Sequence, residues 1–382
     1  MIEERPPQRA KRRWRPLLRS CHAWSGLVLS LLLAAMATSG TVLLFKDDFR
    51  RLALGATTAH PTGDSQRLGG IANAAKARFG DDLRSIRFAS TDLPVHEAVL
   101  ANGGAYLDAD GRAVRIWTGK RPLDLLVEFH HNLFLAEAGR AALGVVATFL
   151  TVMIVSGLIL WWPVRRTWRA RAWPRSARRK EMIAVHRDVG VLITPILLIT
   201  ALTGIVISWP ALIQPLFDFS RKPGVIDTRS AGSVDWRGPL QSASAAVPGA
   251  AIRSLNFGTG NKPKLLRLRH PEEWNSQGLS FVWFDGVGKI AKITDTHSER
   301  RSAHAYGMIF PIHSGQTPQP LFRILLAISG IGLLLISLFG ATAFARKLSA
   351  KGHLGLQSGR SPCDHPETRS PSSVSLRQTE RS

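Results

Sequence analysis

Four long apolar stretches dominate the hydrophobic pattern of the chain. They contain almost no charged side chains and cover residues 24–45, 142–162, 189–209 and 321–345. A helix needs roughly 20 consecutive apolar residues to cross a hydrocarbon core about 30 Å thick. The pattern therefore predicts four transmembrane helices, which with their flanking residues occupy 20–45, 129–163, 186–209 and 313–346.

Shorter apolar runs mark the segment between the first two predicted helices, residues 46–128. Residues 71–79 have the spacing of a short amphipathic helix. Strand-like runs follow at 83–88, 97–100, 105–107 and 113–116. The turn sequence Asp108-Ala-Asp110-Gly111 precedes the last of them. This segment therefore predicts a small α+β domain.

The segment between the last two predicted helices, 210–312, repeats this outline. Arg253-Ser-Leu-Asn-Phe257 matches Arg84-Ser-Ile-Arg-Phe88, and the run from 280 to 290 matches the run from 105 to 114. Self-similarity of this kind indicates an internal repeat. We predict an α-helical membrane protein whose four transmembrane helices form a tandem of two parallel units, with two α+β domains on the outer side of the membrane.

The formal net charge of +23 is distributed unevenly. Basic residues outnumber acidic ones seven to two in 1–19, eight to one in 163–185 and seven to three in 346–382, whereas 46–139 holds twelve of each. An excess of Lys and Arg in short flanks marks the cytoplasmic side. We therefore expect both termini in the cytoplasm. The distribution argues against a nucleic-acid partner and favours anionic lipids at the basic arm 1–19 and the linker 164–185. The polar tail 347–382 has the composition of a disordered segment.

Histidines stand at matching positions near the ends of these helices. His22 and His186 each precede a glycine by four residues, at the cytoplasmic entrances of helices one and three. His130 and His313 each precede an arginine by ten residues, at the outer approach to helices two and four. A histidine at the edge of a membrane span is a functional candidate by default.

Two pairs of histidines on different helices predict two haem sites. A six-coordinate haem iron takes two imidazoles from opposite faces, and bundles build such sites from inward-facing residues. We expect an inner pair, His22 with His186, and an outer pair, His130 with His313. The chain has two cysteines and no Cys-x-x-Cys-His motif, so the haem would be held non-covalently.

Each of these assignments has an alternative. An interfacial histidine can be a polar anchor, or the histidines can bind a metal without haem. His131 competes with its neighbour His130. Arg140 and Arg323 are candidates for pairing with haem propionates, or are arginines that extend to the membrane interface. Gly26 and Gly190 would leave space for a haem, or allow close helix packing. His304 is a weaker candidate, and His270 and His297 receive no role.

These residues give the chain a family resemblance. It resembles the PepSY-associated transmembrane family, bacterial inner-membrane proteins often linked to iron uptake that include siderophore-iron reductases. The resemblance covers residues 15–346, and the first outer segment is similar to a PepSY module. One departure is His131, where an arginine is expected. The motifs are His22-x-x-x-Gly26-Leu27, His130 with Gly139-Arg140, Ser156-Gly157-Leu-Ile-Leu-Trp161-Trp162-Pro163, His186-Arg187-x-x-Gly190 and Ile312-His313-Ser-Gly315.

The resemblance implies a four-helix core, b-type haems in some members and reduction of a ferric chelate on the periplasmic side. We therefore expect a membrane oxidoreductase that passes electrons from a quinol or a cytoplasmic reductant to a ferric siderophore or another Fe(III) chelate. The main alternative is a non-enzymatic membrane regulator or assembly factor whose PepSY-like domains bind a partner protein. A transporter is disfavoured, because four helices with few polar groups make a poor pathway.

Overall fold

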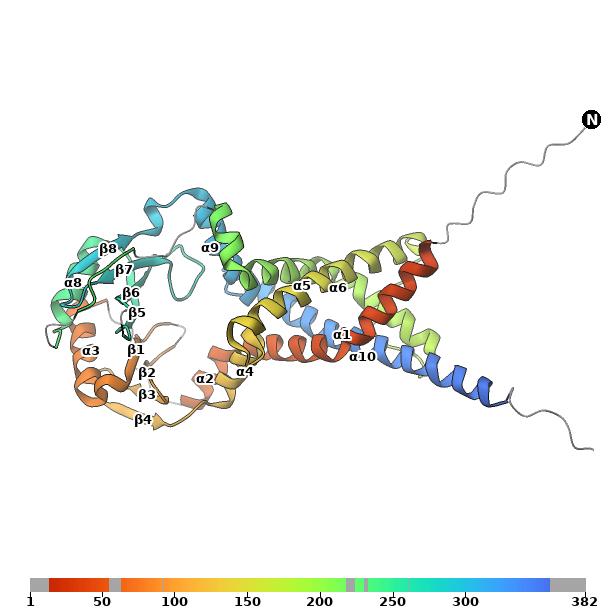
Figure 1. The fold of residues 1–382 in the computed structure, drawn as a ribbon, viewed down its shortest axis with the longest axis horizontal. Coiled ribbons are helices and arrows are strands. Elements are labelled where there is room, and N and C mark those ends of the chain that lie inside the picture. Colours follow the sequence, from red (N-terminus) through yellow and green to blue (C-terminus); the bar gives the residue numbers. More distant parts are fainter. Residues whose placement is uncertain are drawn as a thin grey trace, which may run out of the picture.

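The protein consists of a helical bundle with a β-sheet region at one end (Figure 1). The computed structural model describes residues 14–54, 63–91, 93–217, 224–229, 233–260 and 262–357. The predicted tail 347–382 therefore lies largely outside the described residues, as does most of the basic arm. We call the end of the bundle nearest the sheet the sheet end, and the opposite end the far end.

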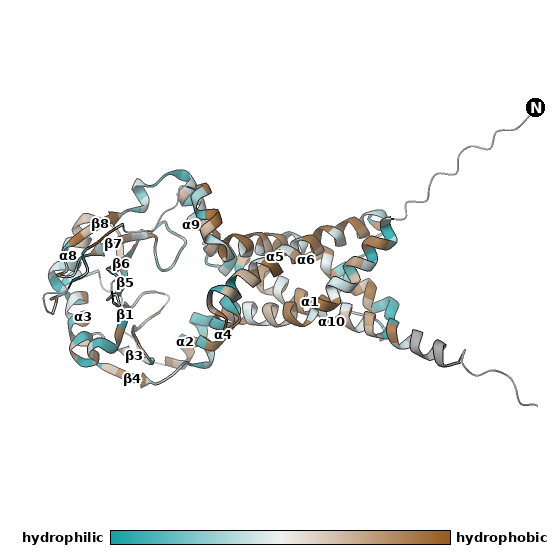
Figure 2. Cartoon of the chain, viewed as in Figure 1, coloured by the Kyte–Doolittle hydropathy of each residue, from teal (hydrophilic) through white to brown (hydrophobic). Residues whose placement is uncertain are grey.

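Four long helices form the bundle, and they confirm the four predicted spans. They are α1 (Trp14–Leu43), α5 (Ala136–Trp161), α6 (Arg179–Ser208) and α10 (Pro320–Gln357). Within the described part of the chain, these are the helices long and apolar enough to cross a membrane, and Figure 2 shows that they consist largely of hydrophobic residues. α10 packs against α1 and α6, and α5 packs against the same two helices, so the bundle closes into a ring.

Two similar halves make up the sheet region. The first half is α2 (Lys46–Leu54), α3 (Ser65–Phe79), a 3₁₀ turn at Gly80–Asp82, β1 (Leu83–Arg87), β2 (His96–Leu100), β3 (Gly103–Leu107) and β4 (Ala113–Trp117). The second half is α8 (Arg237–Ala246), β5 (Ala251–Asn256), β6 (Lys264–Arg269), β7 (Ser280–Phe284), β8 (Ile290–Thr294) and a 3₁₀ turn at Thr296–Ser298. Short helical turns at Trp162–Val164, Pro210–Ile213 (α7) and Gln214–Phe217 flank the bundle helices. The helix and strands predicted in the first outer segment are confirmed.

The two halves share one antiparallel sheet of eight strands. Its order is β4-β3-β2-β1-β5-β6-β7-β8, so the halves meet where β1 pairs with β5. α3 and α8 pack side by side, and Leu68, Ile71 and Leu240 from these helices join one apolar core with the strands. The two outer segments, which the sequence presents as two domains, thus form a single continuous layer.

Two short helices connect this sheet to the bundle. α4 (Pro122–Asn132) precedes α5, and α9 (Arg301–Ser314) precedes α10. Left-handed backbone at Leu133, with φ of 52°, ends α4, and Gly315, with φ of 71°, ends α9. The sequence treats 129–163 and 313–346 as single membrane helices. The structure differs, because these breaks place His130 on α4 and His313 on α9, each free to orient separately from the span that follows.

Candidate functional site

His22 and His186 meet inside the bundle near its far end. α1 begins at Trp14 and α6 at Arg179, so each histidine lies about two turns inside its helix rather than at the first residue. The two ring centres are 6.2 Å apart, and the ring planes are nearly perpendicular at 87°. A metal ion held between two imidazoles at metal–nitrogen distances of about 2 Å separates ring centres by about 6 Å. The two rings therefore have the separation that one bridging metal requires.

Hydrogen bonds hold both of these rings through the same nitrogen. The Nδ1 atom of His186 donates to the carbonyl oxygen of Ile336 over 2.7 Å. The Nδ1 atom of His22 lies 2.8 Å from the Ser156 hydroxyl, and that hydroxyl donates its own proton to the carbonyl of Met153. The serine oxygen therefore accepts from Nδ1, which leaves the lone pair of Nε2 on each ring for a metal.

His130 and His313 are held in the same way at the sheet end. His130 Nδ1 lies 2.9 Å from Ser39 Oγ, and His313 Nδ1 lies 3.0 Å from Thr203 Oγ1. These two hydroxyls also donate to backbone carbonyls of their own helices, at Met36 and Ile199. The same assignment follows, with a proton on Nδ1 and a free Nε2. All four predicted histidines thus share one tautomer.

A glycine on a neighbouring helix faces each of these four rings. A Cβ atom would lie 2.9 Å from His130 at Gly40, 3.1 Å from His186 at Gly340, and 3.4 Å from His22 at Gly157 and from His313 at Gly204. A Cβ would crowd the ring at Gly40 and Gly340, whereas at Gly157 and Gly204 it would lie close to ordinary contact distance. The histidines are therefore fixed on one side by a hydrogen bond and on another by bare helix backbone.

A cavity of about 1160 Å³ opens at the sheet end and reaches between the helices. His130, His131 and His313 line it together with residues of α1, α5, α6 and α10. Its volume exceeds the roughly 300–1,000 Å³ of common small-molecule sites. The outer histidine pair is therefore accessible from the side of the sheet.

Unpartnered polar atoms face this cavity. Among the described side chains, Ser314 Oγ, Arg323 Nε and Ser329 Oγ are buried without a hydrogen bond, and all three residues line the cavity. Buried polar groups are normally satisfied, so these three atoms are available to hydrogen-bond with water or with a polar ligand in the cavity. Arg323 also pairs with Asp48 and lies with its guanidinium 4.5 Å from the centre of the Phe45 ring. Arg140, the matching arginine, lines the same cavity and lies 3.5 Å from Glu137.

Burial keeps the outer histidines neutral. It lowers the pKa of His130, and the neighbouring His313 and His131 lower it further. Burial also lowers the pKa of His313. It lowers the pKa of His131 as well, and the positive charges of Lys46 and Arg140 lower that pKa further. Neutral imidazole is the form that ligates metals. The rings of His131 and His130 have their centres 6.1 Å apart, and Lys46 and Arg140 affect the pKa of His131.

A buried ion pair couples α4 to the sheet. Arg121 precedes the first turn of α4 and binds both Asp124 on that helix and Glu97 on β2, each over 2.8 Å. Glu97 is only 2% exposed and also pairs with Arg87. Burial raises the pKa of Glu97, but Arg87, Arg50 and Arg121 lower it more, so the net shift is downward. The helix that carries His130 is therefore anchored on the sheet.

The glycines that face the histidine rings differ from the two singled out in the sequence, Gly26 and Gly190. At Gly26 a Cβ would meet Met153 at 3.2 Å, so this glycine serves helix packing, whereas Gly190 faces open space. Sequence reasoning missed Ser39-Gly40 and Thr203-Gly204 as histidine supports. A signal existed, because Ser39 follows His22 by 17 residues and Thr203 follows His186 by the same interval.

Comparison with known proteins gives a family match. The model of a family described as the PepSY-associated TM region matches residues 19–347, which include all four supported histidines and the whole sheet. No curated protein matches the chain.

Proposed function

Because the chain belongs to the PepSY-associated TM region family, we propose that this membrane protein is a haem b oxidoreductase that reduces a periplasmic Fe(III) chelate. It would hold two haems, one between His22 and His186 and one between His130 and His313. Bound haem would supply a one-electron carrier on each side of the bilayer. The chain's own residues supply ligands, orientation and a path of access.

One observation carries this proposal. The four histidines form two pairs at the two ends of the bundle, and in each of them a hydrogen bond holds Nδ1 and leaves Nε2 available for a metal. Metal-ligating histidines usually donate their second ring nitrogen to a fixed acceptor, which sets the tautomer and the ring orientation. Ser156 and Ile336 do this for the inner pair, and Ser39 and Thr203 for the outer pair. A histidine acting only as a polar anchor would need no such arrangement.

We also propose that the two halves form a tandem repeat, and matching intervals around the proposed sites support this. Gly157 follows His130 by 27 residues, and Gly340 follows His313 by the same interval. Within each half, the histidine of the first span faces the glycine of the second, and the histidine before the second span faces the glycine of the first. The sheet repeats this relation, because its two halves meet at β1 and β5.

We place the protein in the bacterial inner membrane with both termini in the cytoplasm and the sheet in the periplasm. The basic linker supports this orientation through the positive-inside rule, and its arginines would contact anionic lipids. Electrons would enter at His22 and His186 from a quinol or a cytoplasmic reductant. A quinol releases two electrons and two protons, so one quinol would reduce two ferric ions.

The cavity at the sheet end fits the proposed outer haem and its substrate. Arg323 and Arg140 line the cavity and would supply positive charge to haem propionates or to an anionic ferric siderophore. Each ferric ion gains one electron and becomes Fe(II). Hard oxygen ligands hold Fe(II) less tightly than Fe(III), so the chelate would release its iron.

An optical spectrum of the purified protein tests this function. Dithionite should produce the absorption bands of reduced haem b, with two haems per chain by pyridine haemochrome. His22→Ala and His186→Ala should each lose one haem, while His304→Ala, at an exposed position on α9, should keep both. A colourless protein from haem-replete cells would contradict the proposal and favour the regulator or assembly factor.

A further inference from the structure

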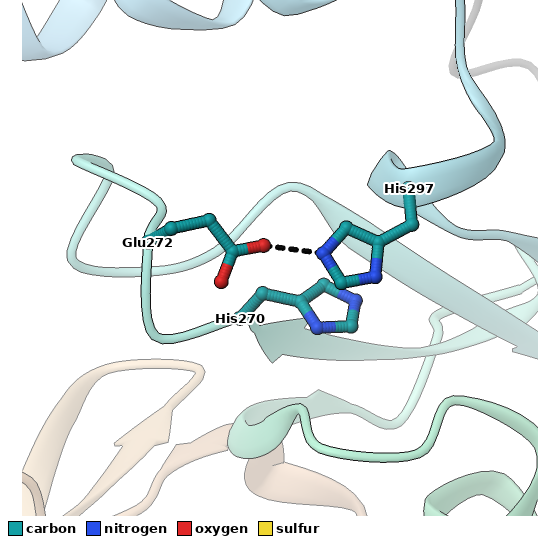
Figure 3. Close-up of side chains that lie close together, drawn as sticks. All are labelled: His270, Glu272 and His297. Atoms are coloured by element: carbon teal, nitrogen blue, oxygen red, sulfur yellow. Dashed lines mark hydrogen bonds and ion pairs between the residues drawn. The ribbon is translucent and has the colours of Figure 1, made fainter.

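A second group of candidate ligands lies on the sheet, apart from the bundle. His270 follows β6, Glu272 lies two residues later, and His297 lies in the 3₁₀ turn after β8. One nitrogen or oxygen from each of the three lies within 4.8 Å of the others. Figure 3 shows the Glu272 carboxylate turned toward both imidazoles. Two segments of the chain, one with His270 and Glu272 and the other with His297, thus meet at one point although they lie 25 residues apart.

The three residues differ in how firmly they are held. His270 is buried, at 1% exposed, and its Nε2 lies 2.7 Å from Asp295 Oδ1. The same Asp295 oxygen accepts hydrogen bonds from the Ser280 hydroxyl and from the backbone N–H of His297. Glu272 and His297 are more than half exposed and contact each other. The site therefore has one rigid ligand and two that can adjust.

This arrangement has the features of a metal site with an outer support. A carboxylate bound to one ring nitrogen orients a histidine whose other nitrogen takes the metal, and Asp295 stands in that relation to His270. The rings of His270 and His297 stack with centres 3.8 Å apart, so a small rotation of the exposed His297 would bring its nitrogen toward an ion. Two imidazoles and one carboxylate suit first-row divalent ions, including Fe(II) and Zn(II).

One of the three candidate ligands also borders the large cavity. Glu272 lines that cavity with its neighbours Pro271 and Glu273, together with His130 and His313, and His270 and His297 lie beside it. An ion leaving the cavity on this side would meet the Glu272 carboxylate on the way out.

We propose that His270, Glu272 and His297 bind a divalent transition-metal ion beside this cavity, which Glu272 borders. Its physiological occupant would be the Fe(II) released from the reduced chelate, an assignment that rests on the proposed function. The site would retain the ion after reduction and keep the Fe(III) chelate from re-forming at the point of release.

Metal titration of the haem-replete protein under anaerobic conditions tests this proposal. Fe(II) and, in a separate experiment, Zn(II) should each bind at one ion per chain by calorimetry. Glu272→Gln and His297→Ala change exposed side chains and should weaken binding by more than about tenfold. Asp110→Asn, at an exposed carboxylate in the β3–β4 turn that pairs with Arg67, should bind like the parent.

The outcomes separate the site from the proposed function. Absence of binding, or equal affinity in the parent and in both ligand variants, would overturn the metal site. The Soret absorbance of the same samples reports haem independently. A protein that binds Zn(II) at this site but holds no haem would keep the site and refute its role in iron release.

Discussion

Gly40→Ala should remove the outer haem while leaving the inner one in place. The new Cβ would lie 2.9 Å from His130 Cε1, whereas carbon atoms in contact stay about 3.5–4.0 Å apart. The ring must therefore withdraw by about 0.6 Å. It has little room to do so, because Ser39, the preceding residue of α1, holds Nδ1 at 2.9 Å. Ligand distances in metal sites tolerate only about 0.2 Å, so the displaced imidazole should no longer reach the iron.

The haem-to-protein ratio measures this effect. We expect pyridine haemochrome analysis to give two haems per chain for the parent and one for Gly40→Ala. Gly204→Ala is the matched control, because its Cβ would lie 3.4 Å from His313 Cε1, close to ordinary contact. Circular dichroism should show equal helix content in all three proteins. If Gly40→Ala retained two haems with an unchanged spectrum, the steric reasoning would be refuted.

Three further outcomes follow from the contacts around the site. Ser156→Ala leaves Nδ1 of His22 without its acceptor, so the rate at which the inner haem transfers to an excess of apo-globin should rise about 10–100-fold. Ser30→Ala is the control, because it removes a hydrogen bond to a carbonyl of its own helix and should leave this rate unchanged. Glu97→Gln should destabilise the sheet region by about 3–5 kcal/mol, which is the cost of breaking a buried ion pair. Denaturant unfolding, monitored by tryptophan fluorescence, measures this loss. The folded-state pKa of Glu97 lies below its ordinary 4.5, so its stabilisation is complete above pH 4.5 and is lost as the pH falls through the folded-state pKa. Acid should therefore lower the unfolding midpoint of the parent more than that of Glu97→Gln, and equal acid sensitivity would contradict this assignment.

Much of the architecture follows from local patterns in the sequence. An apolar run as long as 189–209 predicts a membrane helix by length alone, and α6 covers it. The strands after α3 were predictable for a similar reason, because alternating apolar residues and the Asp108–Gly111 turn specify extended segments and a hairpin locally. The four histidines were also singled out this way, since their spacing to glycine and arginine repeats along the chain.

The helix ends near the outer histidines were less predictable. Leu133 adopts left-handed backbone, a conformation that leucine rarely takes and that its sequence does not announce. This break turns α4 away from the axis of α5 and brings His130 against α1. Without it, 129–163 reads as one continuous helix.

Only the tertiary structure decided which groups meet. The 6.2 Å approach of His22 to His186, the hydroxyls beneath the rings and the joining of two outer segments at β1 and β5 all depend on contacts between distant parts of the chain. His270, Glu272 and His297 carry no shared spacing or periodicity, and the sequence assigns them no role. Hydrophobic periodicity is a property of neighbouring residues and can be read from the chain, whereas convergence of side chains depends on how whole elements pack.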